Sequence, residues 1–399
     1  MTSFSRNTNL WKLRLYFALY IGGGGFLSPF LPLFYKHVGL TGAQMGLLTS
    51  LGWTIAMLLA PFWGRWSDAA KSPKLVLQIA LVGTGIAYIL VGFQTTFLWI
   101  AVCIALGAVF NNSIGSLSTT HALAAADGEK SGFGSIRLFG SLGWAIITPL
   151  AGWLIGQWGL LVPFAGYAAA IIGSALIIQF VTTNLRSTKR NLTQPRVPLR
   201  QVVKSLAKDR FMIGLAAAMF IFWFTGIGRS QFEPIYLTQL GASTGLVGVV
   251  NAIGAVIELP SMLWSDRLVH RYGASAVLRA SMILQAFGLS AAVAAPSVVS
   301  IFLFRAVQGV SFSMLTVAMV TYIIERAPHE QDATALTFYD VTLRGLVTLI
   351  VSPFSGLLFD LVGAYWLFVL ALAGNLISWL ILSVTVRPPK VTRDTMISS

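Results

Sequence analysis

The chain has 399 residues, of which 56% are hydrophobic and only 10% are charged, and its formal net charge is +14. A soluble chain of this size would need about a quarter of its residues charged, so the composition excludes a cytosolic enzyme, a disordered protein and a nucleic-acid-binding module. The single cysteine, Cys103, excludes a disulfide framework and a multi-cysteine metal site. We therefore expect a protein that is embedded in a lipid bilayer and that holds no metal or cofactor.

Long apolar runs follow one another along the whole chain. A bilayer core about 30 Å thick is crossed by roughly 20 apolar residues in a helix, and twelve such runs lie between polar, Gly or Pro residues. The first run is longer than the apolar core of a signal peptide, so it is assigned as a spanning helix. The expected spans are residues 11–35, 43–67, 74–94, 97–122, 132–157, 160–183, 210–238, 243–268, 275–294, 298–324, 332–361 and 364–386.

Basic residues are distributed unevenly between the two sides of the membrane. If the N-terminus lies inside, the inner connections hold nearly all the Lys and Arg residues, whereas Lys36 is the one clear basic residue of the outer connections. The positive-inside rule then places both termini in the cytoplasm and the chain in the cell (inner) membrane. We expect an N-terminal bundle of residues 1–184, a basic cytoplasmic linker of residues 185–209 and a C-terminal bundle of residues 210–399. The linker is a solvated connection or, alternatively, a lipid- or partner-binding segment.

Glycine and proline positions in the two halves repeat at nearly one offset. A shift of 202 places superimposes Pro32, Gly39, Gly46 and Gly52 on Pro234, Gly241, Gly248 and Gly254, and a shift of 204 superimposes Pro149, Gly152 and Gly159 on Pro353, Gly356 and Gly363. Parallel repeats of this kind build two six-helix bundles with a substrate site between them. The sequence therefore predicts an all-α membrane protein with twelve transmembrane helices in two pseudo-symmetric six-helix bundles.

Two connections carry a related motif after the second and the eighth span. Gly64-Arg-Trp-Ser-Asp68 and Asp266-Arg-Leu-Val-His-Arg271 resemble the cytoplasmic signature of the major facilitator superfamily. The resemblance implies a latch in which the acids pair with basic groups and with the dipole of a neighbouring helix, so that one orientation of the bundles is stabilised. The residues of this latch would be Asp68, Asp266, Arg267 and Arg271. Simple anchoring of the connections is the alternative.

The fifth span carries a second resemblance. Phe133-Gly-Ser-Ile-Arg137-Leu-Phe-Gly140-Ser-Leu-Gly143-Trp144 resembles helix 5 of lactose permease and of its sugar, nucleoside and phenylpropionate permease relatives. In that group the matching Arg binds substrate and the matching Trp stacks on a sugar ring, and Glu258 aligns with an acid of helix 8 that binds sugar. The resemblance implies that Arg137, Trp144 and Glu258 contact the substrate. A purely structural bond between Arg137 and Glu258 is the alternative.

Ionisable residues inside the spans are costly, since each costs roughly 2.5–3.5 kcal/mol in the middle of a helix. They are therefore functional candidates: Arg137, Arg229, Glu233, Glu258, Arg305, Asp340 and Arg344. The pairs Arg229/Glu233 and Asp340/Arg344 are four residues apart, so each pair either neutralises itself or takes part in function. Glu258 has no Arg one turn away, so we expect it to carry a proton, with Asp340 as the second choice.

The remaining polar positions extend the candidate substrate site and limit the resemblance. Asn112, Gln308 and Arg344 are added as substrate contacts. Gln308 and Ser311 align with the helix 10 His and the proton-carrying Glu of lactose permease, so lactose and that carrier residue are not expected. His121 either joins a proton relay or is a hydrogen-bonded structural residue. The run Gly22–Gly25 is interpreted as a site of close helix packing, because it lacks the Gly-Lys-Ser/Thr ending of a phosphate loop.

These features favour a secondary active transporter that works by alternating access. We expect symport of protons with a small polar or aromatic solute of the sugar, nucleoside or aromatic acid class, by a monomer that has no nucleic-acid partner. A drug/proton antiporter that exports amphipathic compounds is the alternative within transport, and a non-transporting membrane sensor or scaffold is the alternative from another class. An enzyme is not expected, because the sequence has no His-Glu-x-x-His, no Gly-x-Ser-x-Gly and no P-loop.

Overall fold

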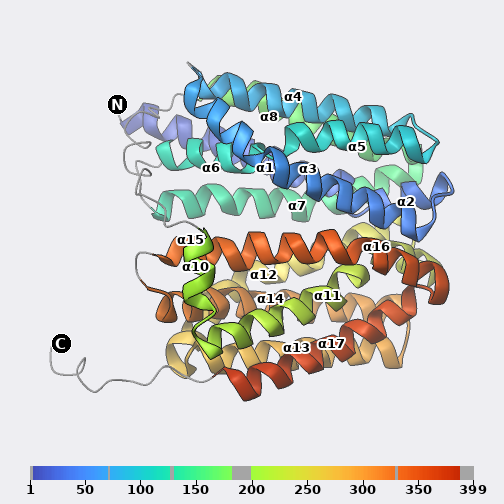
Figure 1. Ribbon diagram of the computed structural model, residues 1–399. Coiled ribbons are helices and arrows are strands. Elements are labelled where there is room, and N and C mark those ends of the chain that lie inside the picture. Colours follow the sequence, from blue (N-terminus) through green and yellow to red (C-terminus); the bar gives the residue numbers. More distant parts are fainter. Residues whose placement is uncertain (1–2, 71, 126–129, 182–198, 329–330, 387–399) are drawn as a thin grey trace.

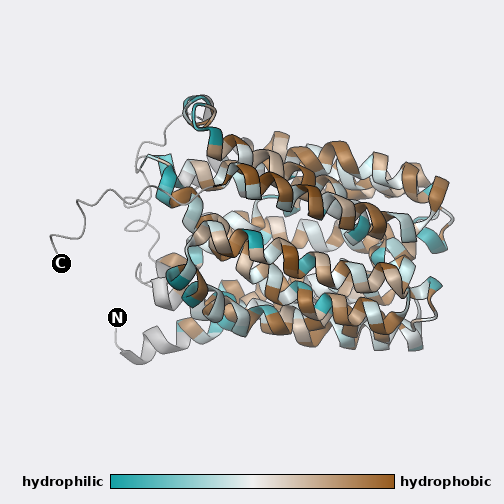
Figure 2. Ribbon diagram, turned by 90° about the horizontal axis from the view of Figure 1, so that it is seen from below, coloured by the Kyte–Doolittle hydropathy of each residue, from teal (hydrophilic) through white to brown (hydrophobic). Residues whose placement is uncertain are grey.

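The computed structural model describes residues 3–70, 72–125, 130–181, 199–328 and 331–386. Within these ranges the regular elements are helices, and twelve helical segments are long and apolar enough to cross a membrane. The prediction of twelve spans is therefore confirmed. Hydrophobic residues occupy most of the length of the helices, and hydrophilic residues gather towards their two ends (Figure 2).

The first six spans form the N-terminal bundle (Figure 1). Two of them are each built from two consecutive helices, α1 with α2 and α5 with α6. The elements are α1 (Ser3–Leu27), α2 (Leu31–His37), α3 (Gly42–Ala69), α4 (Pro73–Gly92), α5 (Phe97–Asn111), α6 (Ile114–Ala125), α7 (Lys130–Trp158) and α8 (Val162–Gln179).

The last six spans form the C-terminal bundle, which lies beside the first (Figure 1). A short α-helix and a π-helical turn lead directly into the eleventh span of the chain. The elements are α11 (Arg210–Gln239), α12 (Thr244–Tyr272), α13 (Ala274–Ala294), α14 (Val298–Arg326), α15 (Asp332–Thr337), η2 (Phe338–Leu343), α16 (Arg344–Val362) and α17 (Ala364–Thr385).

A short amphipathic helix, α10 (Leu199–Leu206), precedes the second bundle. Its apolar residues Val202 and Leu206 are buried. Asp209 then caps α11 by accepting a hydrogen bond from a backbone N–H, and its carboxylate lies 3.2 Å from Nη1 of Arg326 at the end of α14. We call the end of the molecule where α1 begins, α17 ends and α10 lies the linker end, and the opposite end the far end (Figure 1).

The internal repeat is visible in the backbone. Gly39 and its repeat partner Gly241 have φ values of 83° and 90°, and Gly159 and its partner Gly363 both have a φ of 82°. L-residues with a side chain rarely adopt this left-handed conformation, so the chain requires glycine where these helices end. The repeated glycines therefore mark equivalent turns at the far end of the two bundles.

The two bundles meet at the far end through two equivalent helix pairs, α3 with α16 and α7 with α12. A Cβ on Gly46 would lie 2.8 Å from Cα of Pro353, and a Cβ on the repeat partner Gly248 would lie 3.0 Å from Cα of Pro149. The carbonyl oxygens of Ser352 and Thr148 would lie closer still to these two Cβ atoms, at distances that a Cβ contact does not tolerate, so glycine is what allows the backbones to touch. The far end is therefore closed by the same contact made twice.

Candidate functional site

The glycine run of α1 brings this helix against α7. A Cβ on Gly22 would lie 2.6 Å from the carbonyl carbon of Gly143, and one on Gly24 would lie 3.1 Å from the ring of Trp144. The interpretation of Gly22–Gly25 as a site of close helix packing is thus confirmed. Because the Trp144 ring rests on the bare backbone of α1, the packing of these two helices fixes its position.

Arg137 and Glu258 face each other from opposite bundles. The antiparallel contact of α7 with α12 joins Thr148 to Gly248, and the same register, continued towards the linker end, brings Arg137 level with Glu258. The two side chains interact electrostatically. Glu258 is half-buried, whereas Arg137 is exposed and forms no hydrogen bond with any described residue. Its guanidinium therefore keeps its donors free for a ligand between the bundles.

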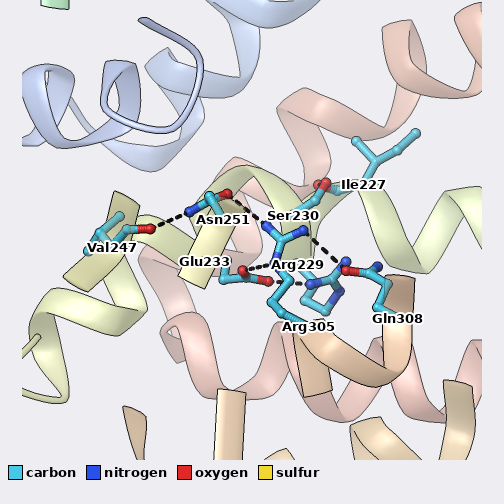
Figure 3. Close-up of polar contacts among 8 residues, drawn as sticks. All are labelled: Ile227, Arg229, Ser230, Glu233, Val247, Asn251, Arg305 and Gln308. Atoms are coloured by element: carbon cyan, nitrogen blue, oxygen red, sulfur yellow. Dashed lines mark hydrogen bonds and ion pairs between the residues drawn. The ribbon is translucent and has the colours of Figure 1, made fainter. Parts of the chain in front are cut away.

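A second charged group lies inside the C-terminal bundle (Figure 3). Glu233 of α11 is fully buried, and its two carboxylate oxygens pair with Nη1 of Arg229 on the same helix and with Nε of Arg305 on α14. Arg305 also donates through Nη2 to Oδ1 of Asn251 at 3.0 Å and through Nη1 to Oε1 of Gln308 at 3.1 Å. We call these five residues the arginine cluster.

The two arginines of the arginine cluster have different surroundings. Arg229 is only 4% exposed, and its guanidinium lies over the rings of Phe304 and Phe368, 4.8 Å and 5.7 Å from their centroids. The side chain of Arg305 is 18% exposed. Asn251 anchors its own amide by donating to the carbonyl of Val247 at 2.9 Å, so its oxygen is turned towards Arg305 (Figure 3). Arg229 is thus shielded from solvent within the cluster, whereas part of the Arg305 side chain remains accessible on what we call the open side of the cluster.

Asp360 joins the two bundles at the far end. It lies in the last turn of α16, and its carboxylate accepts hydrogen bonds from the backbone N–H groups of Gly42 at 2.6 Å and of Ala43 at 2.9 Å, in the first turn of α3. An anionic group at a helix N-terminus is stabilised by the free N–H groups and by the helix dipole. Asp360 therefore stabilises the closed far end.

The family of the chain is decided by its sequence. Residues 10–370 match the model of the MFS_1 like family. The chain belongs to the major facilitator superfamily. It is similar to the uncharacterized transporter YwbF of Bacillus subtilis (strain 168), with 28% identity over 353 residues that cover 87% of this chain and 86% of the relative.

Two further similarities extend over nearly the whole transporter. A maltose permease of Geobacillus stearothermophilus is 26% identical over 359 residues, which cover 88% of this chain and 89% of that protein. The crystal structure of the nucleoside transporter NupG has the same fold, with a TM-score of 0.78, 14% sequence identity and coverage of 96% of this chain and 100% of that chain. This major facilitator is a multi-pass membrane transporter.

The other expected substrate contacts of the transporter are spread over several helices. Gln308 belongs to the arginine cluster. Asn112 lies in the break between α5 and α6, and its amide donates to the carbonyl of Ala56 on α3 at 2.5 Å. Arg344, the first residue of α16, is exposed, and its guanidinium forms no hydrogen bond with the described residues, although its backbone carbonyl accepts one from the hydroxyl of Thr348 at 2.8 Å. Asp340 lies in the π-helical turn η2, and its side chain is outside the described part of the structure.

Among the described residues, the Asp266 half of the cytoplasmic latch expected from the family signature makes no ion pair with another helix. Oδ2 of Asp266 lies 3.7 Å from Nε2 of His270 on its own helix, and the side chains of both are largely exposed. Arg267 and Arg271 are exposed as well. The side chain of Asp68 is outside the described part of the structure. The latch therefore stays a prediction for a conformation in which the linker end is closed.

Two contacts were not expected from the sequence. Mutual neutralisation of Glu233 and Arg229 was one of the two alternatives for this pair. The additional bond of Glu233 to Arg305 was not expected, because these two residues are 72 positions apart in the chain and lie on different helices. Asp360 was not singled out, although an acid in the last turn of a spanning helix was a visible signal. His121, considered for a proton relay, is buried, at 1% exposure.

Proposed function

We propose that this transporter is a secondary active carrier that moves a small solute by alternating access. The observation that carries the proposal is the pair Arg137 and Glu258, which face each other across the two bundles. An arginine and a carboxylate inside membrane-spanning helices are costly unless they serve transport. Since they belong to bundles that move relative to each other, a ligand bound between them senses both.

The proposed substrate site surrounds this pair. Trp144 lies seven residues, or two helical turns, from Arg137 and hence on the same side of α7, and its ring offers an apolar face to a solute. Gln308, Arg344 and Asn112 complete the proposed set of contacts from other helices. Polar groups beside an aromatic face suit a hydroxylated or aromatic solute.

The similarities to a maltose permease and to a nucleoside transporter support a solute of the sugar or nucleoside class, and the aromatic acids are added from the resemblance at residues 133–144. Export of amphipathic drugs in exchange for protons is the second candidate within transport. It is less well supported by the site, because the net positive charge of the arginine cluster disfavours a cationic compound. A sensor or scaffold would not require the charged pair between the bundles.

The proposal includes an orientation. The basic connections lie at the linker end, so we place this end and both chain termini in the cytoplasm and the transporter in the inner membrane. The closed far end then faces outwards, and the conformation is open to the cytoplasm. Residues 1–184, 185–209 and 210–399 would be the N-terminal bundle, the linker and the C-terminal bundle of a monomer.

Coupling to protons is assigned first to Glu258. Its carboxylate is half-buried and has Arg137 of the other bundle as its charged neighbour, so movement of the bundles changes its electrostatic surroundings and its affinity for a proton. Asp340 is the second choice. Glu233 is held between two arginines of its own bundle, so movement of the bundles does not change its charged partners.

The experiment that tests this assignment compares accumulation with exchange in proteoliposomes. Glu258→Gln should lose accumulation driven by a proton gradient and keep exchange of internal for external solute, since exchange needs only the loaded carrier to reorient. Glu325→Gln, which removes an exposed acid at the linker end of α14, is the control and should keep both. Accumulation that survives Glu258→Gln and disappears in Asp340→Asn would transfer the role to Asp340. Accumulation that ignores the proton gradient in the wild type would remove proton coupling.

A further inference from the structure

The arginine cluster carries one more positive than negative charge. Two guanidinium groups, those of Arg229 and Arg305, share the single carboxylate of Glu233, and the other partners of Arg305 are neutral amides. A buried charge that has no counter-charge is expensive, because neither water nor lipid stabilises it well there. The cluster is therefore electrostatically incomplete in the absence of a ligand.

The incomplete side of the cluster is that of Arg305. A guanidinium has five N–H donors, and three nitrogens of Arg305 each use one donor, towards Glu233, Asn251 and Gln308. One N–H on each of the two terminal nitrogens is left. Terminal N–H groups of a guanidinium are the donors that bind the oxygens of a carboxylate. Arg229 offers no such face, because aromatic rings cover it.

The open side of Arg305 belongs to the space between the bundles. Arg305 extends from α14 to residues of α11 and α12, and α14 otherwise packs mainly on α12 and α13, whereas α11 packs mainly on α16 and α17. Arg305 thus lies where α11, α12 and α14 approach one another. Since α11 and α12 also contact the N-terminal bundle and the side chain of Arg305 is partly exposed, we assign its accessible part to the side that faces that bundle.

The two charged groups lie along one side of the same helix. Asn251, the partner of Arg305, and Glu258, the partner of Arg137, are seven residues apart on α12, which is about 10 Å along the helix axis. The register of α7 with α12 places Trp144 level with Asn251. An extended solute that reaches Arg305 with one end would therefore pass the Trp144 ring and reach the Arg137 and Glu258 pair with the other.

We propose that the substrate is an organic anion, whose carboxylate binds the two free donors of Arg305 and completes the charge of the arginine cluster. This inference rests on the proposed transport function and selects, among the sugar, nucleoside and aromatic acid classes, the acids. The matching molecule has a carboxylate at one end and an aromatic or polar group several carbon atoms away. Neutral sugars leave the cluster incomplete, and cationic drugs are repelled by it.

The test uses probes that differ only in charge. Aryl carboxylates with alkyl spacers of one to four carbon atoms are compared with the corresponding primary amides and primary amines by thermal stabilisation of the purified full-length protein. The carboxylates should stabilise the wild type, and the amides should bind at least about tenfold more weakly, since a neutral amide cannot form the charge-assisted pair that a carboxylate forms with a guanidinium. The amines should not bind.

Two variants with the same change of charge test the residue. Arg305→Gln should weaken carboxylate binding at least about tenfold, whereas Arg229→Gln removes the same charge but keeps the donors of Arg305, so it should weaken binding less than Arg305→Gln does. Each variant leaves Glu233 with one arginine, so both clusters are neutral, and melting without ligand verifies that both are folded. Arg305→Lys, which keeps the charge and loses the paired donors, should restore part of the affinity.

The possible failures are distinguishable. Amides that bind as well as the acids, an equal loss in Arg305→Gln and Arg229→Gln, or a series in which no carboxylate binds would overturn the inference. Stabilisation by a neutral sugar or nucleoside that is lost in Arg137→Gln would refute the assignment of an anionic substrate, but it would be consistent with the proposed transport function. Transport of no solute from any of these classes would remove both.

Discussion

Asp360 is the residue whose removal should most directly change the balance between the two orientations of the bundles. Its carboxylate, on the C-terminal bundle, accepts hydrogen bonds from Gly42 and Ala43 at 2.6 Å and 2.9 Å, on the N-terminal bundle. Asp360→Asn removes the charge and keeps one acceptor oxygen, whereas Asp360→Ala removes the charge and both acceptor oxygens. Since the carboxylate is exposed to solvent, we expect a loss of about 1 kcal/mol for Asn and about 2 kcal/mol for Ala. At 1.4 kcal/mol per factor of ten, the ratio of closed to open far ends should fall about fivefold and about thirtyfold.

The assay is the distance between two spin labels at the far end. Thr95 in the loop between α4 and α5 and Gln239 at the end of α11 are exposed and belong to different bundles, and Cys103→Ser provides the cysteine-free background. Electron paramagnetic resonance should show a population with a longer distance between the labels, and this population should grow from the wild type to Asp360→Asn to Asp360→Ala. Glu325→Gln at the linker end is the control and should leave the distribution unchanged. A distribution that stays at the wild-type distance in Asp360→Ala would refute the role of this contact.

Three further perturbations follow from the same contacts. Glu233→Gln leaves the buried guanidinium of Arg229 and the partly exposed one of Arg305 without a carboxylate, so the melting temperature should fall with a loss of about 3–5 kcal/mol. Arg229→Met in the same chain should restore part of the lost stability, and an unchanged melting temperature would contradict the burial argument. Gly46→Leu places a side chain in the backbone of α16, so the far-end label distance should lengthen, and a short distance would show that the helices adapt. Asp209→Ala removes the cap of α11 and the ion pair with Arg326. Protease cleavage near α10 should then become faster, and the melting temperature should fall by the equivalent of about 1 kcal/mol. Unchanged cleavage would argue against this anchoring.

The twelve spans and the two-bundle division could be predicted because they follow from simple constraints. Bilayer thickness sets the length of an apolar helix, and glycines that need a left-handed backbone, such as Gly39 and Gly241, recur at the repeat offset. The interruptions at Ser28–Phe30 and at Asn112 and the π-helical turn Phe338–Leu343 were not predicted. They do not change the hydropathy of the chain, so an apolar run does not reveal them.

The candidate site was predictable only where one helix sufficed or where the resemblance supplied the partner. Arg137 and Glu258 were paired because the resemblance placed them at matching positions, and the structure brings them together. Helical spacing gives the neighbours of Glu233 on its own helix, but its bond to Arg305 depends on which helices pack side by side. The contact of Asp360 with the start of α3 was missed for the same reason.

The central claim is that the space between the bundles carries a solute across the membrane by way of Arg137. The measurement that tests it most directly is solute accumulation in proteoliposomes under an imposed proton gradient, with a mixture of sugars, nucleosides and aromatic acids outside and mass spectrometry of the trapped contents. The account predicts that the wild type accumulates at least one solute over empty liposomes and that Arg137→Gln does not. Equal contents in wild-type, Arg137→Gln and empty liposomes, or full accumulation by Arg137→Gln, would contradict it.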